Sequence, residues 1–143
     1  MSFTYKGSCL CGDVSFEVKQ FIPEVSHCHC TMCRKFHGAA YATYGGVKNT
    51  DFRWLTGENT LCEFTADNGT VRSFCKRCGS SLIFYSSKEA ADVVEIALAT
   101  MDSDIPVLPD AHIFTNYALK WTSKDSTLPC FGEGRLNSQP AHK

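Results

Sequence analysis

The sequence has no long apolar segment and no basic cluster. None of its apolar runs approaches the roughly 20 residues that a membrane-spanning helix needs. Lys and Arg never occur in runs longer than two residues, and the formal net charge is -1. Nucleic acids and acidic membranes bind basic surfaces. The composition therefore predicts neither a nucleic-acid partner nor a membrane partner.

The N-terminal segment 1–6 also lacks the apolar core and the cleavage site of a signal peptide. We therefore expect a cytoplasmic protein. Cysteine, by contrast, is abundant, with nine residues in the chain. Cytoplasmic thiols stay reduced, and an odd number of cysteines cannot pair completely. Metal binding is thus favoured over a disulfide framework.

The remaining composition is that of an ordinary globular protein. The chain has 143 residues, of which 43% are hydrophobic and 20% charged, enough for one domain with a core. Apolar and polar side chains alternate in several short segments, as in strands with one buried face. These segments are Val14–Val18, Tyr41–Tyr44, Phe52–Trp54, Leu61–Phe64, Val71–Phe74, Leu82–Tyr85 and Val93–Ala99.

Turn signals separate these segments. Asn68-Gly69 predicts a tight hairpin, because both central positions of such a turn favour positive φ. Gly45-Gly46 and Thr56-Gly57 predict further turns. Short helical turns are expected at 30–37 and 87–91, whereas the polar, Gly- and Pro-containing segment 132–143 suggests a loosely ordered C-terminal tail.

Seven of the nine cysteines form three clusters. Cys9-Leu-Cys11 is a C-x-C pair, and Cys75-Lys-Arg-Cys78-Gly79 is a C-x-x-C turn. These two pairs together make a closed set of four thiolates, as in structural zinc sites. Zinc–thiolate bonding, on the order of ten kcal/mol in small zinc peptides, offsets the entropy of closing the long intervening loop.

The third cluster, Cys28-His-Cys30-Thr-Met-Cys33, has only three cysteines. Two interpretations remain open. Either His27, His29 or a distant residue completes a second structural site, or the fourth position is open to water or to a substrate thiol, as in catalytic zinc sites. A soft centre of this kind suits reactions that make or break a carbon–sulfur bond.

The segment that follows the triplet offers groups suited to an anionic substrate. Arg34 and Lys35 would hold carboxylates, and His37 has the pKa range for proton transfer. The alternative interpretation is a solvated basic turn that offsets thiolate charge. Cys62 and Cys130 fall outside the clusters, and we interpret both as buried, apolar-like thiols.

Three motifs together resemble one family. Gly7-Ser-Cys9-Leu-Cys11-Gly12, Cys28-His-Cys30-Thr-Met-Cys33-Arg34-Lys35 and Ser73-Phe74-Cys75-Lys-Arg-Cys78-Gly79 are similar to the motifs of the glutathione-dependent formaldehyde-activating family. This family shares its domain with centromere protein V. Ala111-His112-Ile113-Phe114 and Trp121 are similar to a downstream pattern, so the resemblance extends over about 1–131.

The resemblance implies a small, complex, mainly β fold with zinc-stapled β-sheets and short helical turns, forming a single domain at 1–131. It also implies two Zn²⁺ ions per chain, a structural ion on Cys9, Cys11, Cys75 and Cys78 and a catalytic ion on Cys28, Cys30 and Cys33. The implied activity joins formaldehyde and glutathione into S-hydroxymethylglutathione, and in reverse it is a carbon–sulfur lyase.

The resulting hypothesis is a zinc-dependent lyase that acts on a glutathione–aldehyde adduct. Zinc on the triplet would hold the sulfur of glutathione or a similar small thiol, Arg34 or Lys35 would position carboxylates, and His37 or water would move the proton. The alternative is a non-catalytic, zinc-stapled protein-interaction module, because a fold alone does not fix a function. Trp54 is compatible with either a core or a pocket position.

Overall fold

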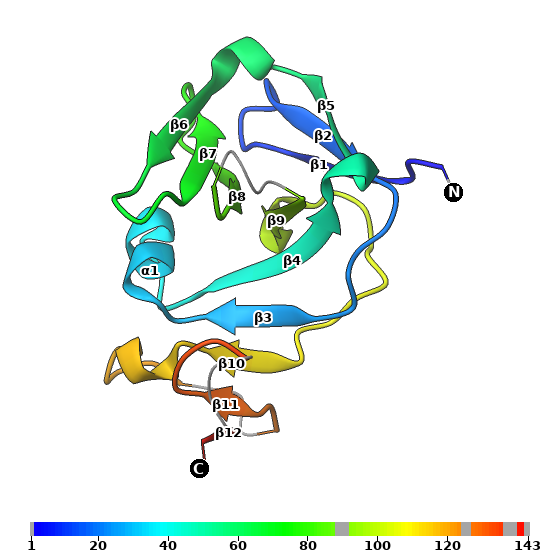
Figure 1. Ribbon diagram of the computed structural model, residues 1–143. Coiled ribbons are helices and arrows are strands. Elements are labelled where there is room, and N and C mark those ends of the chain that lie inside the picture. Colours follow the sequence, from blue (N-terminus) through cyan, green and yellow to red (C-terminus); the bar gives the residue numbers. More distant parts are fainter. Residues whose placement is uncertain (1, 88–91, 124–126, 136–139, 142–143) are drawn as a thin grey trace. The chain divides into compact units, whose positions relative to one another are not determined.

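The computed structural model describes residues 2–87, 92–123, 127–135 and 140–141 (Figure 1). The chain divides into two compact units. Unit 1 comprises Met1–Pro23 and Gly45–Val107, and unit 2 comprises Glu24–Tyr44 and Leu108–Lys143. Strand β4 (Ala42–Lys48) begins in unit 2 and ends in unit 1.

The first sheet of unit 1 has three antiparallel strands (Figure 1). They are β1 (Tyr5–Ser8), β2 (Ser15–Val18) and β5 (Phe52–Thr56), with β2 in the centre. In β2, Phe16 and Val18 are fully buried, whereas Ser15 is partly exposed. Glu17 is also buried, because it forms a salt bridge with Arg53 on the neighbouring strand. The alternating pattern predicted this strand. The ion pair explains why Glu17 is buried at a position where the pattern predicts an exposed side chain.

The second sheet of unit 1 contains antiparallel strands in the order β9-β8-β7-β6. Their bounds are Leu61–Thr65 for β6, Val71–Cys75 for β7, Ser81–Tyr85 for β8 and Val93–Ala97 for β9. The predicted hairpin joins β6 to β7, and there the Ala66 N–H donates to the Thr70 carbonyl. Gly69 has φ +91°. Among the described non-glycine residues only Phe114 has a positive φ, so Asn68 does not adopt the positive φ that we expected.

The core of unit 1 lies between side chains of both sheets. Phe16, Val47, Leu82 and Ile96 are each 0% exposed. Short 3-10 helices, Asn49–Asp51, Glu58–Thr60 and Leu98–Thr100, connect the strands. The buried cysteines Cys9 and Cys75 belong to the same apolar cluster. The sulfur group that contains them is therefore built on the core rather than on an isolated loop.

Unit 2 contains the only α-helix of the described residues, α1 (Thr31–His37). Its strands follow the order β12-β11-β10-β3. They are β3 (Val25–Cys28), β10 (Ala111–Ile113), β11 (Cys130–Phe131) and β12 (Pro140–Ala141), with a 3-10 helix at Thr115–Tyr117. Strands β3 and β10 pair in parallel, which places His112 opposite His27. Sequence patterns predicted α1 but not these short strands.

The predicted turn at Gly45-Gly46 is wrong, because β4 continues through both glycines. Neighbouring side chains occupy the space that a Cβ atom would need. A Cβ on Gly45 would lie 2.9 Å from Leu98 Cδ2, and one on Gly46 would lie 3.2 Å from Ile22 Cδ1. The lack of a side chain at these glycines therefore lets neighbouring side chains pack closely against the strand, a role that glycine often has in sheets.

The mainly β prediction is confirmed, and the described strands include all seven predicted segments in part or in full. The single domain at 1–131 and the tail at 132–143 stay predictions. Within the proposed tail, β12 pairs with β11, and Arg135 donates hydrogen bonds to the Ser26 hydroxyl and the Val25 carbonyl. Four positions of the helical turn predicted at 87–91 lie outside the described residues. No helix in the described residues is long and apolar enough to cross a membrane.

The Gly57 turn provides a stability test. Gly57 has φ +82°, and an added Cβ would lie 2.2 Å from the Asp13 carbonyl oxygen. Gly69 also has positive φ, but its Cβ would meet only the Ser86 carbonyl, at 3.7 Å. Because both alanine variants carry backbone strain and only Gly57→Ala adds a backbone clash, we expect it to lose about 1–3 kcal/mol more than Gly69→Ala. Urea unfolding measures both, and equal losses would contradict the packing argument.

Candidate metal centres

Four cysteines of unit 1 bring their sulfur atoms together, all within 4.8 Å of one another. The group consists of Cys9, Cys11, Cys75 and Cys78. The Cys9 and Cys11 sulfurs lie 3.5 Å apart, and those of Cys11 and Cys75 lie 3.8 Å apart. Four sulfurs bonded to one tetrahedral zinc at about 2.3 Å would lie about 3.8 Å from each other. The donor set thus fits a closed tetrathiolate zinc site.

Backbone and hydroxyl groups surround these sulfurs. The Val14 N–H donates to Cys9 Sγ (3.3 Å), and the Cys78 N–H donates to Cys75 Sγ (3.5 Å). The Ser80 hydroxyl lies 3.2 Å from Cys78 Sγ, and this hydrogen bond is the main cause that lowers the Cys78 pKa to about 5. The Ser80 hydroxyl thus favours the thiolate form of Cys78, which is the form that binds metal.

The second sulfur group lies in unit 2 and has three members, Cys28, Cys30 and Cys33, again within 4.8 Å of one another. Cys28 ends β3, Cys30 caps the N-terminus of α1, and Cys33 lies in the first turn of that helix. The Cys33 N–H donates to Cys30 Sγ (3.3 Å), and the Arg34 N–H donates to the Cys30 carbonyl. The start of the helix therefore brings Cys33 back beside Cys30.

Neither flanking histidine joins this group in the described part of the chain. His27 Nδ1 lies 2.7 Å from the Thr43 hydroxyl. His29 is 0% exposed, and its Nε2 lies 2.9 Å from His112 Nδ1. Alternation along β3 explains the position of His27, since consecutive side chains point to opposite faces of a strand, and His29 follows the strand and pairs with His112. The geometry thus speaks against a closure of the triplet by His27 or His29.

Ionising these three neighbouring thiols is unfavourable unless a cation is bound to them. Hydrogen bonding to Cys30 and Cys33, together with burial, raises the pKa of Cys28 far above its ordinary value. Cys28 is 7% exposed and Cys33 is 1% exposed, so water does little to stabilise a negative charge there. A soft divalent ion such as zinc would compensate three ionised sulfurs, and the donor set fits that ion.

The structure places the predicted substrate residues on the helix that carries Cys33. Arg34 is half-buried, and its Nε donates to the His29 carbonyl (3.3 Å). Lys35 is exposed. His37 is half-buried and hydrogen-bonds through Nε2 to the hydroxyl of Tyr44, which is 4% exposed. Arg34 therefore supports the loop between the cysteines, whereas Lys35 extends into solvent.

Sequence reasoning missed the residues that surround the two histidines beside the triplet. The Tyr41 ring lies 4.7 Å from His27 and 4.9 Å from His29 between centroids, and His112 approaches both histidines. The segment containing His112 was noticed only as part of the family resemblance. A buried histidine pair has no periodic signal, because strand pairing brings its members together from 83 positions apart.

The two remaining cysteines lie apart from the sulfur groups. Cys130 is 6% exposed, as expected for an apolar-like thiol. Cys62 is partly exposed on β6, opposite Phe74 of β7. It therefore differs from the buried position that we expected.

Comparison with known proteins agrees with these motifs. The family described as glutathione-dependent formaldehyde-activating enzyme matches residues 4–117, a span that includes all seven clustered cysteines. The chain belongs to this family. Both sulfur groups lie within the matched residues, and the resemblance seen in the three motifs is confirmed.

Two individual proteins are more distantly similar to this chain. A Schizosaccharomyces pombe protein named as an uncharacterized lyase is 25% identical over 80 residues, which are 56% of this chain and 56% of that protein. The chain thus spans little more than half the length of this relative. A solved Rhodobacter sphaeroides protein has a TM-score of 0.59 at 23% identity, covering 71% of this chain and 91% of its own. The latter likeness supports the fold alone.

The buried histidine pair provides a test of the support around the triplet. His29 and His112 are both 0% exposed, so replacing His112 by Phe leaves a buried imidazole nitrogen without this partner. We expect the single variant to lose about 1–3 kcal/mol of unfolding free energy. The double variant His29→Phe/His112→Phe should lose less than the sum of the two single losses, because no polar partner is then left behind. Urea unfolding of all three variants gives the coupling free energy between His29 and His112, and strictly additive losses would contradict the prediction.

Proposed function

We propose that this protein is a zinc-dependent carbon–sulfur lyase that acts in the cytoplasm on a glutathione–aldehyde adduct, with S-hydroxymethylglutathione as the expected compound. Membership of the glutathione-dependent formaldehyde-activating family supports the proposal, and so does the relative named as a lyase. The proposed partner is a small thiol such as glutathione, and neither a nucleic acid nor a membrane is proposed.

One observation carries the proposal, namely the composition of the triplet. In the described residues this group contains three sulfurs, and no imidazole nitrogen or carboxylate oxygen lies within 4.8 Å of all three, whereas the group in unit 1 contains four sulfurs. Zinc sites with four protein ligands are structural, and those with three keep a position for water or substrate. We therefore assign a structural zinc to Cys9, Cys11, Cys75 and Cys78, and a catalytic zinc to Cys28, Cys30 and Cys33.

When bound, a zinc ion supplies Lewis acidity that stabilises a substrate thiolate near neutral pH. The residues of the chain supply the remaining functions. Lys35, exposed on α1, binds a carboxylate of glutathione, and Arg34 holds the cysteine loop through the His29 carbonyl and contributes positive charge. Cys28, Cys30 and Cys33 are fixed by β3 and α1, so their sulfurs need little rearrangement.

The reaction forms one carbon–sulfur bond and transfers one proton. An electron pair of the glutathione sulfur forms the carbon–sulfur bond to the aldehyde carbon, and the carbonyl pair moves to the oxygen. His37, oriented by the Tyr44 hydroxyl, or a water molecule then protonates that oxygen. The thiol has lost one proton and the new hydroxyl has gained one, so the addition balances. The lyase direction reverses each of these steps.

A second candidate function is the non-catalytic, zinc-stapled interaction module. Exposed apolar side chains in unit 2 favour it, since Leu108 is 80% exposed and Trp121 is 72% exposed. Large apolar side chains of this kind often contact partners when they gather on one surface. The module needs no glutathione, and the second experiment below therefore separates it from the lyase.

The zinc assignment predicts different consequences for the two groups. Zinc analysis of the purified protein should give about two ions per chain, and Cys30→Ser should lose about one of them while keeping the β-sheet circular dichroism spectrum. Cys75→Ser should lose zinc and unfold, because its site is structural. Cys62→Ser is the matched control and should keep both ions, since Cys62 belongs to neither group. Global unfolding of Cys30→Ser would mean that the triplet is structural.

The lyase proposal predicts faster interconversion of glutathione and S-hydroxymethylglutathione. Because the adduct also forms without an enzyme, the measured quantity is the exchange rate at equilibrium by NMR, which should rise in proportion to the zinc-loaded protein. Lys35→Ala should weaken glutathione binding about two- to fivefold in calorimetry. Lys120→Ala, an equally exposed lysine of unit 2, should leave binding unchanged. An unchanged exchange rate together with no binding heat at millimolar glutathione would favour the module.

A further inference from the structure

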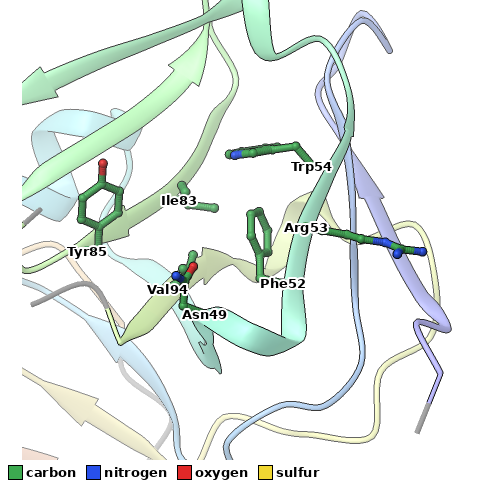
Figure 2. Close-up of a pocket in the computed structure, with 7 residues that line it drawn as sticks. All are labelled: Asn49, Phe52, Arg53, Trp54, Ile83, Tyr85 and Val94. Atoms are coloured by element: carbon green, nitrogen blue, oxygen red, sulfur yellow. The ribbon is translucent and has the colours of Figure 1, made fainter.

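Unit 1 contains a cavity of about 310 Å³ that none of the proposed catalytic residues lines (Figure 2). Its lining comes from η1 (Asn49–Asp51), β5, β8 and β9. The lining residues are Asn49, Phe52, Arg53, Trp54, Ile83, Tyr85 and Val94. The volume lies at the lower end of the roughly 300–1,000 Å³ that is typical of small-molecule sites.

Two perpendicular aromatic rings form one corner of this cavity. The rings of Phe52 and Trp54 are 4.9 Å apart between centroids, at an interplanar angle of 87°. Phe16, which is 0% exposed, packs behind both, with centroids at 5.5 Å and 5.9 Å. The buried ring fixes the corner in place. A flat ring that enters can stack on one wall and meet the other edge-on, the two arrangements that aromatic pairs prefer.

The opposite wall is apolar at its base and carries a phenol. Ile83 and Val94 are buried at 3% and 4% exposure, and Tyr85 stands beside them on β8 (Figure 2). The Tyr85 hydroxyl donates to Glu63 (2.6 Å). Burial, followed by this hydrogen bond, raises the pKa of Tyr85 to about 12. The phenol is therefore neutral at physiological pH.

Among the described residues that line the cavity, no charged side chain is directed into it. Arg53 borders it, but Figure 2 shows the guanidinium pointing away, and there it forms a salt bridge with the buried Glu17. Two neutral polar groups remain, the indole N–H of Trp54 and the side-chain amide of Asn49. Neither makes a hydrogen bond to any other described residue. The indole is a donor only, and so it selects an acceptor.

We propose that this cavity is a binding site for a neutral, flat molecule of one or two fused aromatic rings that carries a hydrogen-bond acceptor. The ring stacks in the corner made by Phe52 and Trp54, and the acceptor receives the Trp54 indole N–H. The apolar base and the absence of an inward-facing charge among the described lining residues disfavour anions and cations, which would lose their hydration without a counter-charge. This inference does not depend on the proposed lyase activity.

Coumarin, a neutral two-ring lactone with a carbonyl acceptor, is the probe. The full-length zinc-loaded protein has two tryptophans, Trp54 and Trp121, and hence two indole N–H signals in a ¹H–¹⁵N spectrum. Trp54→Phe and Trp121→Phe assign them. Titration of the wild type should shift the Trp54 signal saturably and leave the Trp121 signal unchanged, because Trp121 is 72% exposed and lies outside the cavity.

Two analogues and two variants then test the ligand class. Octahydrocoumarin keeps the lactone without the flat ring, and coumarin-3-carboxylate adds a negative charge. Both should bind at least about tenfold more weakly than coumarin. Trp54→Leu should weaken coumarin binding about three- to tenfold in ligand-detected NMR, whereas Trp121→Leu should not.

Each outcome supports or overturns a defined part of the proposal. An unchanged Trp54 signal in the wild type at millimolar coumarin would overturn the site, whether or not Trp54→Leu folds. Equal binding of octahydrocoumarin would overturn the aromatic class, and equal binding of coumarin-3-carboxylate would overturn the requirement for a neutral ligand. Loss of coumarin binding in Trp121→Phe would place the interaction elsewhere. A selective shift of Trp54 with the expected order of analogues supports the proposal.

Discussion

Burying several cysteine sulfurs side by side is the constraint on which the rest of the structure depends. Hydrogen bonds with Cys30 and Cys33, together with burial, raise the pKa of the Cys28 thiol, and ionised thiolates repel each other unless a cation lies between them. In unit 1, two sulfurs of such a group, those of Cys9 and Cys75, also belong to the apolar core. Metal affinity and core formation are therefore coupled there, because the ligands assemble only when the strands do.

The two sulfur groups are assembled in different ways, and the difference matters for function. Cys9 and Cys75 meet across 66 positions of chain, so their group joins distant strands. The triplet comes from one short segment in which β3 ends and α1 begins. A group of ligands close together in the sequence closes a shorter loop than a distant group does, so it contributes less to stability through loop-closure entropy. Its ligands are consequently better suited to a site whose coordination changes during a reaction.

Spacing predicted the two sulfur groups because C-x-C and C-x-x-C are local patterns whose geometry the backbone determines. Alternation predicted the longer strands for the same reason. Outside the cysteine groups, the prediction failed where partners are distant in sequence. The turn expected at Gly45-Gly46 is a strand because Leu98 and Ile22 pack against it, and His112 reaches His29 only through the pairing of β10 with β3. No local pattern encodes such contacts.

The aromatic cavity shows why membership of a family leaves part of the chemistry undecided. The three cysteine motifs that carry the family resemblance account for seven cysteines, whereas Phe52, Trp54 and Tyr85 lie within the matched residues 4–117 but outside those motifs. Trp54 was compatible with a core or a pocket position, and it serves both, with one side against Phe16 and another bordering the cavity. An indole that only filled the core would be buried by its neighbours. The ring is partly exposed, and no described residue accepts its N–H, which is instead the arrangement expected where a ligand completes the packing.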